Sequence, residues 1–257
     1  MHAARVTPAG AVMRWVEIAG EAEPARVYLH GLGAAAAPYF TGSATHPALA
    51  GHRSLLVDLL GFGLSDRPAD FGYSLEEHAD TVAVLLREAG VAGADVIAHS
   101  MGGSVAILLA ARHPELVARL VLIDANLDPV VVRPGAIGSS GIASYTEAEF
   151  LAGGLAEVRE RVGAHWWSTM RLADPLALHR SAVRLARGSE PTMREQLVGL
   201  KVPRSYLFPA DEGEPAGRAQ LAAAGVEVLG IPDCGHNIML DNTEAFVAAV
   251  AGFLAGS

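Results

Sequence analysis

The sequence predicts an α/β fold, with a mostly parallel, twisted sheet flanked by helices and a helical cap insertion. Short β-rich apolar runs alternate with longer helix-patterned segments, which is typical of parallel strands joined by helices. The alternation stops between Asn126 and Leu200, so we expect this stretch to be inserted into the fold. The chain has 257 residues, 51% of them hydrophobic, and parallel-sheet folds of this size routinely form one cooperative unit.

Six apolar runs are predicted as strands of this sheet. After an amphipathic stretch at 12–18, they cover residues 25–29, 54–57, 95–98, 120–123, 205–208 and 226–231. The run at 120–123 is continuously apolar, as expected for a parallel strand that is buried on both faces. Asp124 follows at its carboxyl end. Ligands of parallel sheets bind at such ends, so candidate site residues are expected there.

Helices are predicted both around the sheet and within the insertion. Those around the sheet cover residues 74–89, 101–112, 216–224 and 243–254. We therefore divide the chain into a core, residues 1–125 and 200–257, and a cap or lid, residues 126–199. Residues 130–144 are rich in Gly, Ser and Val without a helical period, which predicts a mobile loop. Beyond it, apolar residues recur every three or four positions up to Leu172, and Pro175 begins a further helical segment.

Charge and cysteine content exclude several classes of function. The formal net charge is −9 and Lys and Arg form no cluster, so we expect no nucleic-acid binding. Cys234 is the only cysteine, which excludes an internal disulfide and any cysteine-based metal site. Residues 1–30 hold no continuous apolar segment, which favours a cytoplasmic protein without membrane attachment. We expect a monomer or a homodimer that binds a small molecule.

The sharpest motif covers residues 96–103, where an apolar run ends in a tight turn at Ser100 and a helix-forming segment follows. Such a turn holds its central serine in a strained backbone conformation, which requires small residues two positions before and after it. Ala98 and Gly102 occupy these positions. The pattern is typical of a nucleophile elbow, in which the Met101 amide at the helix N-terminus would stabilise an oxyanion.

Two further strand ends carry residues suited to the same chemistry. The run at 27–29 leads into a His-Gly-Leu-Gly turn, where the glycines let the backbone approach a ligand. The Leu32 amide is a candidate second oxyanion donor, and we interpret His30 as an orienting residue of this turn. His236 lies between the last predicted strand and the last predicted helix, a place suited to a general base.

Together these motifs resemble the α/β-hydrolase fold superfamily along almost the whole chain. A glycine turn at 58–66 adds to the resemblance, as does the Gly-His-Asn loop at 235–237. The resemblance implies a serine hydrolase of the esterase or lactonase branch, with a Ser-His-Asp triad and an oxyanion hole. In this family the nucleophile, the acid and the histidine follow one another in that order, and Ser100 and His236 match the outer two.

Two carboxylates compete for the role of the acid that orients His236. Asp211 follows a later strand, which is the commoner position in the family, and its spacing to Pro215 matches the family's Asp-x-x-x-Pro pattern. Asp124 ends the preceding strand, where it resembles the acid of zearalenone lactonases, and the insertion starts there as in those relatives. We take Asp124 as the acid and keep Asp211 as the alternative.

The expected reaction is attack by Ser100 on a carbonyl, followed by hydrolysis of the acyl-enzyme. The residues expected to bind the substrate are His30, Gly31, His99, Trp166, Trp167 and Met170. The aromatic cap residues indicate a mostly apolar ester, thioester or lactone. No histidine spacing suits zinc, so we expect neither a metal nor an organic cofactor. Acyl transfer, carbon–carbon bond hydrolysis and ligand binding without turnover remain the alternatives.

Overall fold

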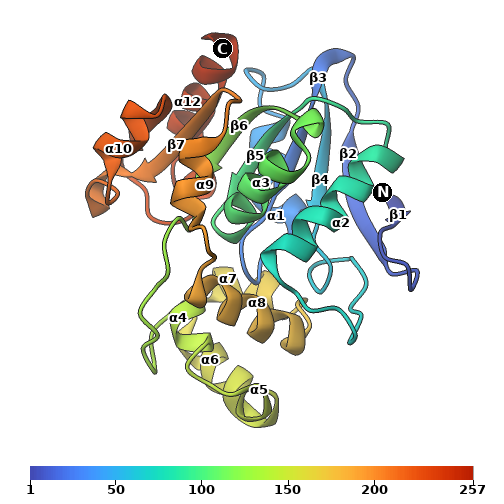
Figure 1. Cartoon of the computed structure of the whole chain (residues 1–257), viewed down its shortest axis with the longest axis vertical. Coiled ribbons are helices and arrows are strands. Elements are labelled where there is room, and N and C mark those ends of the chain that lie inside the picture. The colour runs from blue at the N-terminus through green and yellow to red at the C-terminus, as the bar shows by residue number, and fades with distance from the viewer. Residues whose placement is uncertain (257) are drawn as a thin grey trace.

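The computed structural model describes residues 1–256, which form one eight-stranded sheet between two layers of helices (Figure 1). The strand order is β1-β2-β4-β3-β5-β6-β7-β8. β2 pairs antiparallel with both β1 and β4, whereas the neighbouring strands from β4 to β8 are all parallel. The predicted α/β class with a mostly parallel sheet is confirmed.

The core elements that the sequence predicted lie close to their expected positions. The strands are β1 (His2–Arg5), β2 (Val12–Ile18), β3 (Ala22–Leu29), β4 (His52–Asp58), β5 (Ala94–His99), β6 (Val117–Ile123), β7 (Arg204–Pro209) and β8 (Val226–Ile231). The core helices are α1 (Ala36–Ala44), α2 (Leu75–Glu88), α3 (Met101–Arg112), α10 (Arg218–Ala223), α11 (Ile238–Asp241) and α12 (Thr243–Gly256). Among the helices of residues 1–256, none has the length and apolar character needed to span a membrane.

Side chains at alternate strand positions bury two separate cores, one on each face of the sheet. Val27 and Val96 belong to the core that includes α2 and α3, whereas Tyr28 and Ile97 belong to the core that includes α1 and α12. A continuous apolar run supplies both cores because successive strand side chains point to opposite faces. Because β5 pairs in parallel with both β3 and β6, the carboxyl ends of these three strands lie side by side.

The insertion lies between β6 and β7, beyond the carboxyl end of β6 (Figure 1). It consists of α4 (Ser139–Ile142), α5 (Glu147–Glu149), a π-helical turn (Phe150–Gly154), α6 (Leu155–Arg161), α7 (Ala164–Met170), α8 (Pro175–Arg187) and α9 (Met193–Gly199). Residues 130–144, expected to be a loop throughout, contain α4, which is too short to produce a periodic pattern. The helical pattern before Leu172 is interrupted at Val162, whose backbone is extended.

Among the core elements, α1, β1 and the short helix α11 were not predicted. α1 contains Pro38 and Gly42, which are weak helix formers, and its N-terminus has no side-chain cap of its own. The Asp58 carboxylate on β4 accepts the Ala36 amide at 2.8 Å, so a tertiary contact supplies the missing cap. β1 has no apolar run because it is an edge strand that pairs with β2.

Candidate active site

Ser100 lies on the tight turn between β5 and α3, at the carboxyl edge of the sheet. Its backbone has φ 52° and ψ −119°, a conformation that residues with side chains rarely adopt. The Ser100 amide donates to the Ile123 carbonyl at 2.9 Å, and the Ser100 carbonyl accepts from the Gly103 amide at 2.9 Å. A Cβ at Gly102 would lie 2.6 Å from the His30 carbonyl oxygen, so only glycine fits there. The strand–turn–helix geometry expected around Ser100 is present.

His236 pairs with Asp124, whose carboxylate lies at the end of β6. The His236 Nδ1 atom is 2.6 Å from Asp124 Oδ2, so the carboxylate favours the tautomer with the proton on Nδ1 and leaves Nε2 as an acceptor. The other candidate carboxylate, Asp211, accepts the Asp233 amide at 2.8 Å. The structure therefore brings Asp124 to His236, whereas Asp211 holds the backbone of the loop that leads to this histidine.

The hydroxyl of Ser100 is hydrogen-bonded to Asn126. Ser100 Oγ donates to Asn126 Oδ1 at 3.3 Å, and within residues 1–256 no hydrogen bond joins it to His236. Asn126 comes two residues after Asp124, so the amide and the carboxylate belong to the same strand-end segment. The Ser100 proton is therefore directed toward the Asn126 amide oxygen.

Two backbone amides beside Ser100 are available to a ligand. Within residues 1–256, the N–H groups of Leu32 and Met101 donate no hydrogen bond. His30 fixes the peptide that carries the Leu32 amide: its Nδ1 is 2.8 Å from the Gly31 carbonyl oxygen, and its Nε2 accepts the Leu59 amide at 3.1 Å. The proton of this ring therefore lies on Nδ1. Burial lowers the pKa of His30, which keeps the ring neutral.

His99 supports the loop that carries His236. Its Nε2 is 2.9 Å from the His236 carbonyl oxygen and must carry the ring proton, because a carbonyl only accepts. The centroids of the two imidazoles are 4.6 Å apart. Burial, and to a smaller extent the neighbouring His236, lower the pKa of His99 well below its usual value. His99 is therefore a neutral hydrogen-bond donor to the backbone.

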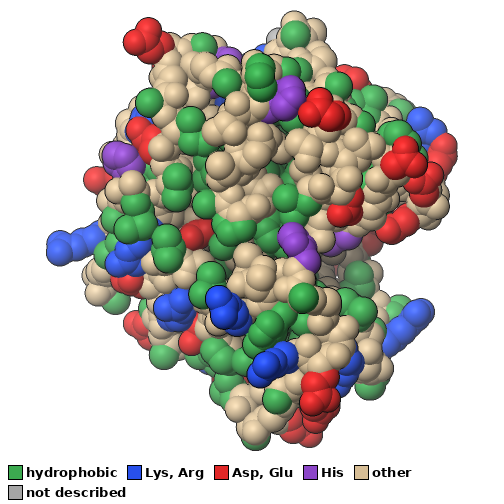
Figure 2. Space-filling model, turned by 180° about the vertical axis from the view of Figure 1, so that it is seen from behind, with side chains coloured by type: hydrophobic (Ala, Val, Ile, Leu, Met, Phe, Trp, Pro, Cys, Tyr) green, Lys and Arg blue, Asp and Glu red, His purple; other side chains and the backbone are tan. Residues whose placement is uncertain are grey.

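A cavity of about 470 Å³ opens onto Ser100, a volume suited to a small organic molecule. Seen from behind, the surface is hollowed near the middle of the molecule, and histidine side chains lie beside this hollow (Figure 2). The cavity wall includes Leu32, Tyr39, Asn126 and Asn237 from the core side and Val130, Ile137, Trp166 and Leu185 from the insertion. No Lys, Arg, Asp or Glu of the described chain lines it. The cavity therefore suits a neutral, mostly apolar ligand.

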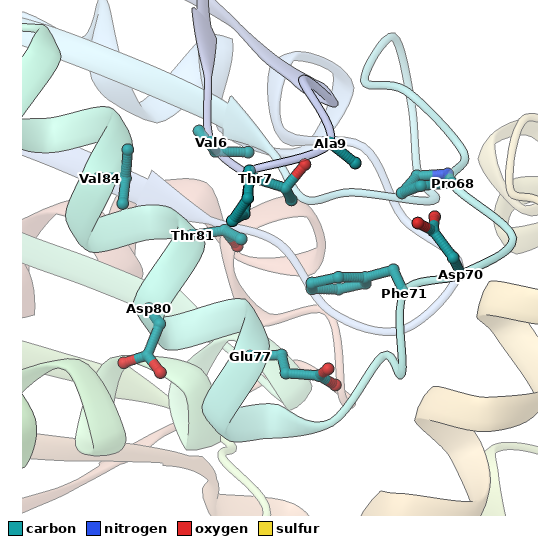
Figure 3. Close-up of a pocket in the computed structure, with 11 residues that line it drawn as sticks. Val6, Thr7, Ala9, Pro68, Asp70, Phe71, Glu77, Asp80, Thr81 and Val84 are labelled. Carbon is teal, nitrogen blue, oxygen red and sulfur yellow. The ribbon is translucent and has the colours of Figure 1, made fainter.

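A second hollow, beside α2, does not gather comparable groups. Its volume is about 430 Å³, it lies between the β1–β2 turn and α2, and among the described residues neither a nucleophile such as Cys or Ser nor a His lines it (Figure 3). Two of its carboxylates are already bonded, Glu77 to Ser74 and Asp80 to Arg112. Among residues 1–256, no group of three or more His, Cys, Asp or Glu side chains is placed to hold a metal ion.

The remaining residues expected to bind substrate fall into two groups. Gly31, His99 and Trp166 line the cavity. Three others do not: His30 is fully buried, Met170 is buried in the core, and Trp167 packs under the Arg159 guanidinium, 5.3 Å from the ring centroid. Successive helix residues point about 100° apart, so Trp166 and Trp167 of α7 point in different directions, and only Trp166 of the two lines the cavity.

Several cavity residues were missed by the sequence reasoning. Asn126 follows a strand end, and that position is a signal that could have identified it. Tyr39 belongs to α1, which no periodic pattern predicted, and Ile137 belongs to the segment that was expected to be a mobile loop. These residues reach the cavity through the packing of α1 and the insertion, which the sequence pattern does not encode.

Comparisons with known proteins agree with this architecture. A family model of the alpha/beta hydrolase fold matches residues 25–137. A 2-hydroxymuconate semialdehyde hydrolase of Pseudomonas putida is 41% identical over 103 residues, which cover 40% of this chain and 36% of that protein. This match therefore spans only about a third of the relative's own length.

Solved structures match over nearly the whole chain. An esterase from Exiguobacterium antarcticum superposes with a TM-score of 0.78 at 19% identity, covering 98% of both chains. An enol-lactonase from Burkholderia xenovorans LB400 superposes with a TM-score of 0.75 at 21% identity, covering 99% of this chain and 100% of that one. The family model over residues 25–137 and the full-length superpositions lead to one conclusion: this chain has the α/β-hydrolase fold.

Proposed function

We propose that this protein is a serine hydrolase that cleaves a carboxylic ester or lactone of a mostly apolar small molecule through an acyl-enzyme on Ser100. The observation that carries the proposal is the strained turn that presents Ser100 to the cavity. A paired imidazole and carboxylate, His236 and Asp124, complete the set of groups needed to activate a serine.

The proposed reaction uses groups already near one another. Nε2 of His236 removes the Ser100 proton, Oγ attacks the carbonyl carbon, and the Leu32 and Met101 amides bind the oxyanion. The imidazolium then gives its proton to the leaving alkoxide, and water, activated by His236, releases the acid. Asp124 stabilises the imidazolium in both steps. Each oxyanion donor is worth about 3 kcal/mol in the transition state.

The neutral cavity and the named neighbours support this substrate class. The described lining holds no charged Lys, Arg, Asp or Glu side chain, and Ile137, Trp166 and Leu185 make its insertion side apolar. The superposed structures include an esterase and an enol-lactonase. We further propose that residues 126–199 act as a cap, because side chains of this segment cover the cavity above Ser100.

The test combines covalent labelling with turnover. Wild-type protein and the variants Ser100→Ala and Ser168→Ala are treated with a fluorophosphonate probe, and intact mass is recorded beside hydrolysis of p-nitrophenyl hexanoate and an aliphatic lactone. Ser168 is an exposed serine of α7 and serves as the matched control. We expect labelling and turnover in wild type and S168A and neither in S100A. Labelling or turnover that survives in S100A would disprove the assignment.

Hydrolysis of a carbon–carbon bond is the second candidate, because the same activated serine can attack a ketone carbonyl. Its support is the 41% identity to a 2-hydroxymuconate semialdehyde hydrolase over part of the chain. A muconate-type substrate is anionic, and the described cavity wall offers no Lys or Arg to pair with it. An ester or lactone substrate therefore fits the cavity better than a muconate-type substrate. Comparing the turnover of neutral and anionic substrates decides between the two candidate functions.

A further inference from the structure

Helix α7 of the insertion is hydrogen-bonded to the loop at residues 30–34, here called the oxyanion loop because it carries the Leu32 amide. The indole Nε1–H of Trp166 donates to the Leu32 carbonyl at 2.9 Å. The Thr169 hydroxyl donates to the Gly33 carbonyl at 3.1 Å. A Cβ at Gly33, where φ is 67°, would lie 3.0 Å from Trp166 Nε1, so α7 lies directly on the loop.

These bonds act on consecutive peptide groups. The Gly31 carbonyl is held from the core by His30, and the next two carbonyls along the chain are held from the insertion by Trp166 and Thr169. Because each peptide group is planar, fixing its carbonyl also fixes its N–H, and fixing the following groups restricts the rotation of Leu32. The direction of the Leu32 amide therefore depends on α7 as well as on the core.

The two side chains differ in what else they touch. Trp166 lines the cavity, so a bound ligand contacts the residue that holds the Leu32 carbonyl. Thr169 is buried, with 4% of its surface exposed, and does not line the cavity. Besides the Gly33 carbonyl, its hydroxyl reaches the Trp166 carbonyl at 3.2 Å and interacts with the Tyr39 side chain. Thr169 therefore allows the loop to be altered without replacing a residue of the cavity wall.

We propose that Trp166 and Thr169 are positioning residues that couple the placement of α7 to the competence of the oxyanion hole. The inference rests on the proposed function, because it assigns these residues to the same reaction. An oxyanion donor is effective only when it is fixed before the charge develops. With α7 in place the Leu32 amide is aligned for the tetrahedral intermediate, and a displaced α7 leaves a site that binds substrate but turns it over slowly.

The test removes each hydrogen bond while keeping shape. Thr169→Val is nearly isosteric and lacks the hydroxyl, Thr169→Ser restores it, and Trp166→Phe removes the indole N–H. Ser168→Ala on the same helix and Trp15→Phe are matched controls. Ser168 bonds within α7, and Trp15 lies on β2, where it donates to Glu17. For each variant, kcat and KM for p-nitrophenyl hexanoate are measured beside the affinity of a trifluoromethyl ketone, which forms an oxyanion adduct with serine.

We expect T169V and W166F to lower kcat by about tenfold to a hundredfold, since a misaligned donor loses part of the effect of a deleted one. The KM of T169V should stay within about threefold of wild type. In both variants the affinity for the trifluoromethyl ketone should fall by the same factor as kcat/KM. T169S should recover most of the activity. A T169V kcat within about twofold of S168A, or a change in KM alone, would overturn the proposal.

Amide hydrogen exchange gives a readout that does not depend on turnover. Exchange in a peptide containing residues 30–36 should be faster in T169V and W166F than in S168A and W15F, because the loop loses its contacts with α7. Equal exchange in all four variants would refute the coupling even if the wild type were inactive. An inactive wild type whose variants still show faster exchange would instead refute the proposed hydrolase function alone.

Discussion

The Nδ1 atom of His236 lies 2.6 Å from Oδ2 of Asp124, a residue 112 positions earlier in the chain. Asp124 has φ 41°, which is uncommon for a residue with a side chain. Two contacts hold the strand end in this shape: the Asp124 amide donates to the Leu207 carbonyl at 2.8 Å, and the Tyr206 hydroxyl donates to the Ala125 carbonyl at 3.0 Å. β7 thus fixes the direction in which the carboxylate points.

This pairing predicts different outcomes for the two candidate acids. Asp124→Asn should lower kcat for a p-nitrophenyl ester by about 10²- to 10⁴-fold, because the imidazole loses the carboxylate that sets its tautomer. Asp211→Asn should change kcat by less than about threefold, since Asp211 bonds to the backbone of Asp233. Steady-state kinetics on both variants, with melting temperatures as a check on folding, test the assignment. A larger loss in D211N would reverse it.

Gly102 is expected to be intolerant of even one added methyl group. A Cβ there would lie 2.6 Å from the His30 carbonyl and 2.7 Å from the Leu29 carbonyl, both of which are backbone. Gly102→Ala should therefore reduce the free energy of unfolding by about 1–3 kcal/mol and lower activity by distorting the elbow. Gly252→Ala, in α12 where a Cβ meets no atom within 4 Å, should instead raise it by about 0.5–1 kcal/mol. Urea unfolding measures both, and equal effects would contradict the expectation.

The buried His78 is expected to make stability depend on pH. Within residues 1–256 neither ring nitrogen has a hydrogen-bond partner, and the ring packs against Phe62, Phe71 and Tyr73. Burial, and secondarily His30 nearby, lower the pKa of His78 from 6.5 to about 3. Between these values the unfolded chain binds a proton that the folded chain does not, so stability is lost as the pH falls below 6.5.

The variant His78→Phe tests this directly because it removes the titrating group and keeps an aromatic ring. The difference in unfolding free energy between H78F and wild type should grow by about 1.4 kcal/mol for each pH unit between pH 6 and pH 4. Urea unfolding at pH 4, 5, 6 and 7 provides the measurement. A difference that stays constant across this range would show that His78 is not the responsible group.

The uncharged cavity wall predicts discrimination against anionic substrates. Two substrates of equal chain length are compared: p-nitrophenyl hexanoate, which is neutral, and p-nitrophenyl hydrogen adipate, which carries a terminal carboxylate. The kcat/KM should be at least about tenfold higher for the neutral ester. A carboxylate in this cavity finds no Lys or Arg among the described lining residues and loses hydration on entry. Initial rates at low substrate concentration give the ratio. Comparable or reversed values would favour the carbon–carbon bond hydrolase.

Local patterns were enough to predict the framework of the site. The run at 96–103 required a strand, a tight turn and a helix, and the structure places β5, Ser100 and α3 there. The position of His236 after β8 followed from the last apolar run. The same reasoning missed α1, because Pro38 and Gly42 weaken its helical signal and Asp58 supplies its N-terminal contact from another element.

By itself, the sequence determined the α/β fold, the strained turn at Ser100 and the loop that carries His236, because each depends on residues that are neighbours in the chain. Three further relationships appear only once the chain is folded: Asp124 reaches His236, the Ser100 hydroxyl bonds to Asn126, and Trp166 rather than Trp167 faces the cavity. These relationships depend on how β6, β7 and α7 pack against one another. Periodicity gives the spacing of side chains along one element but carries no distance between two elements.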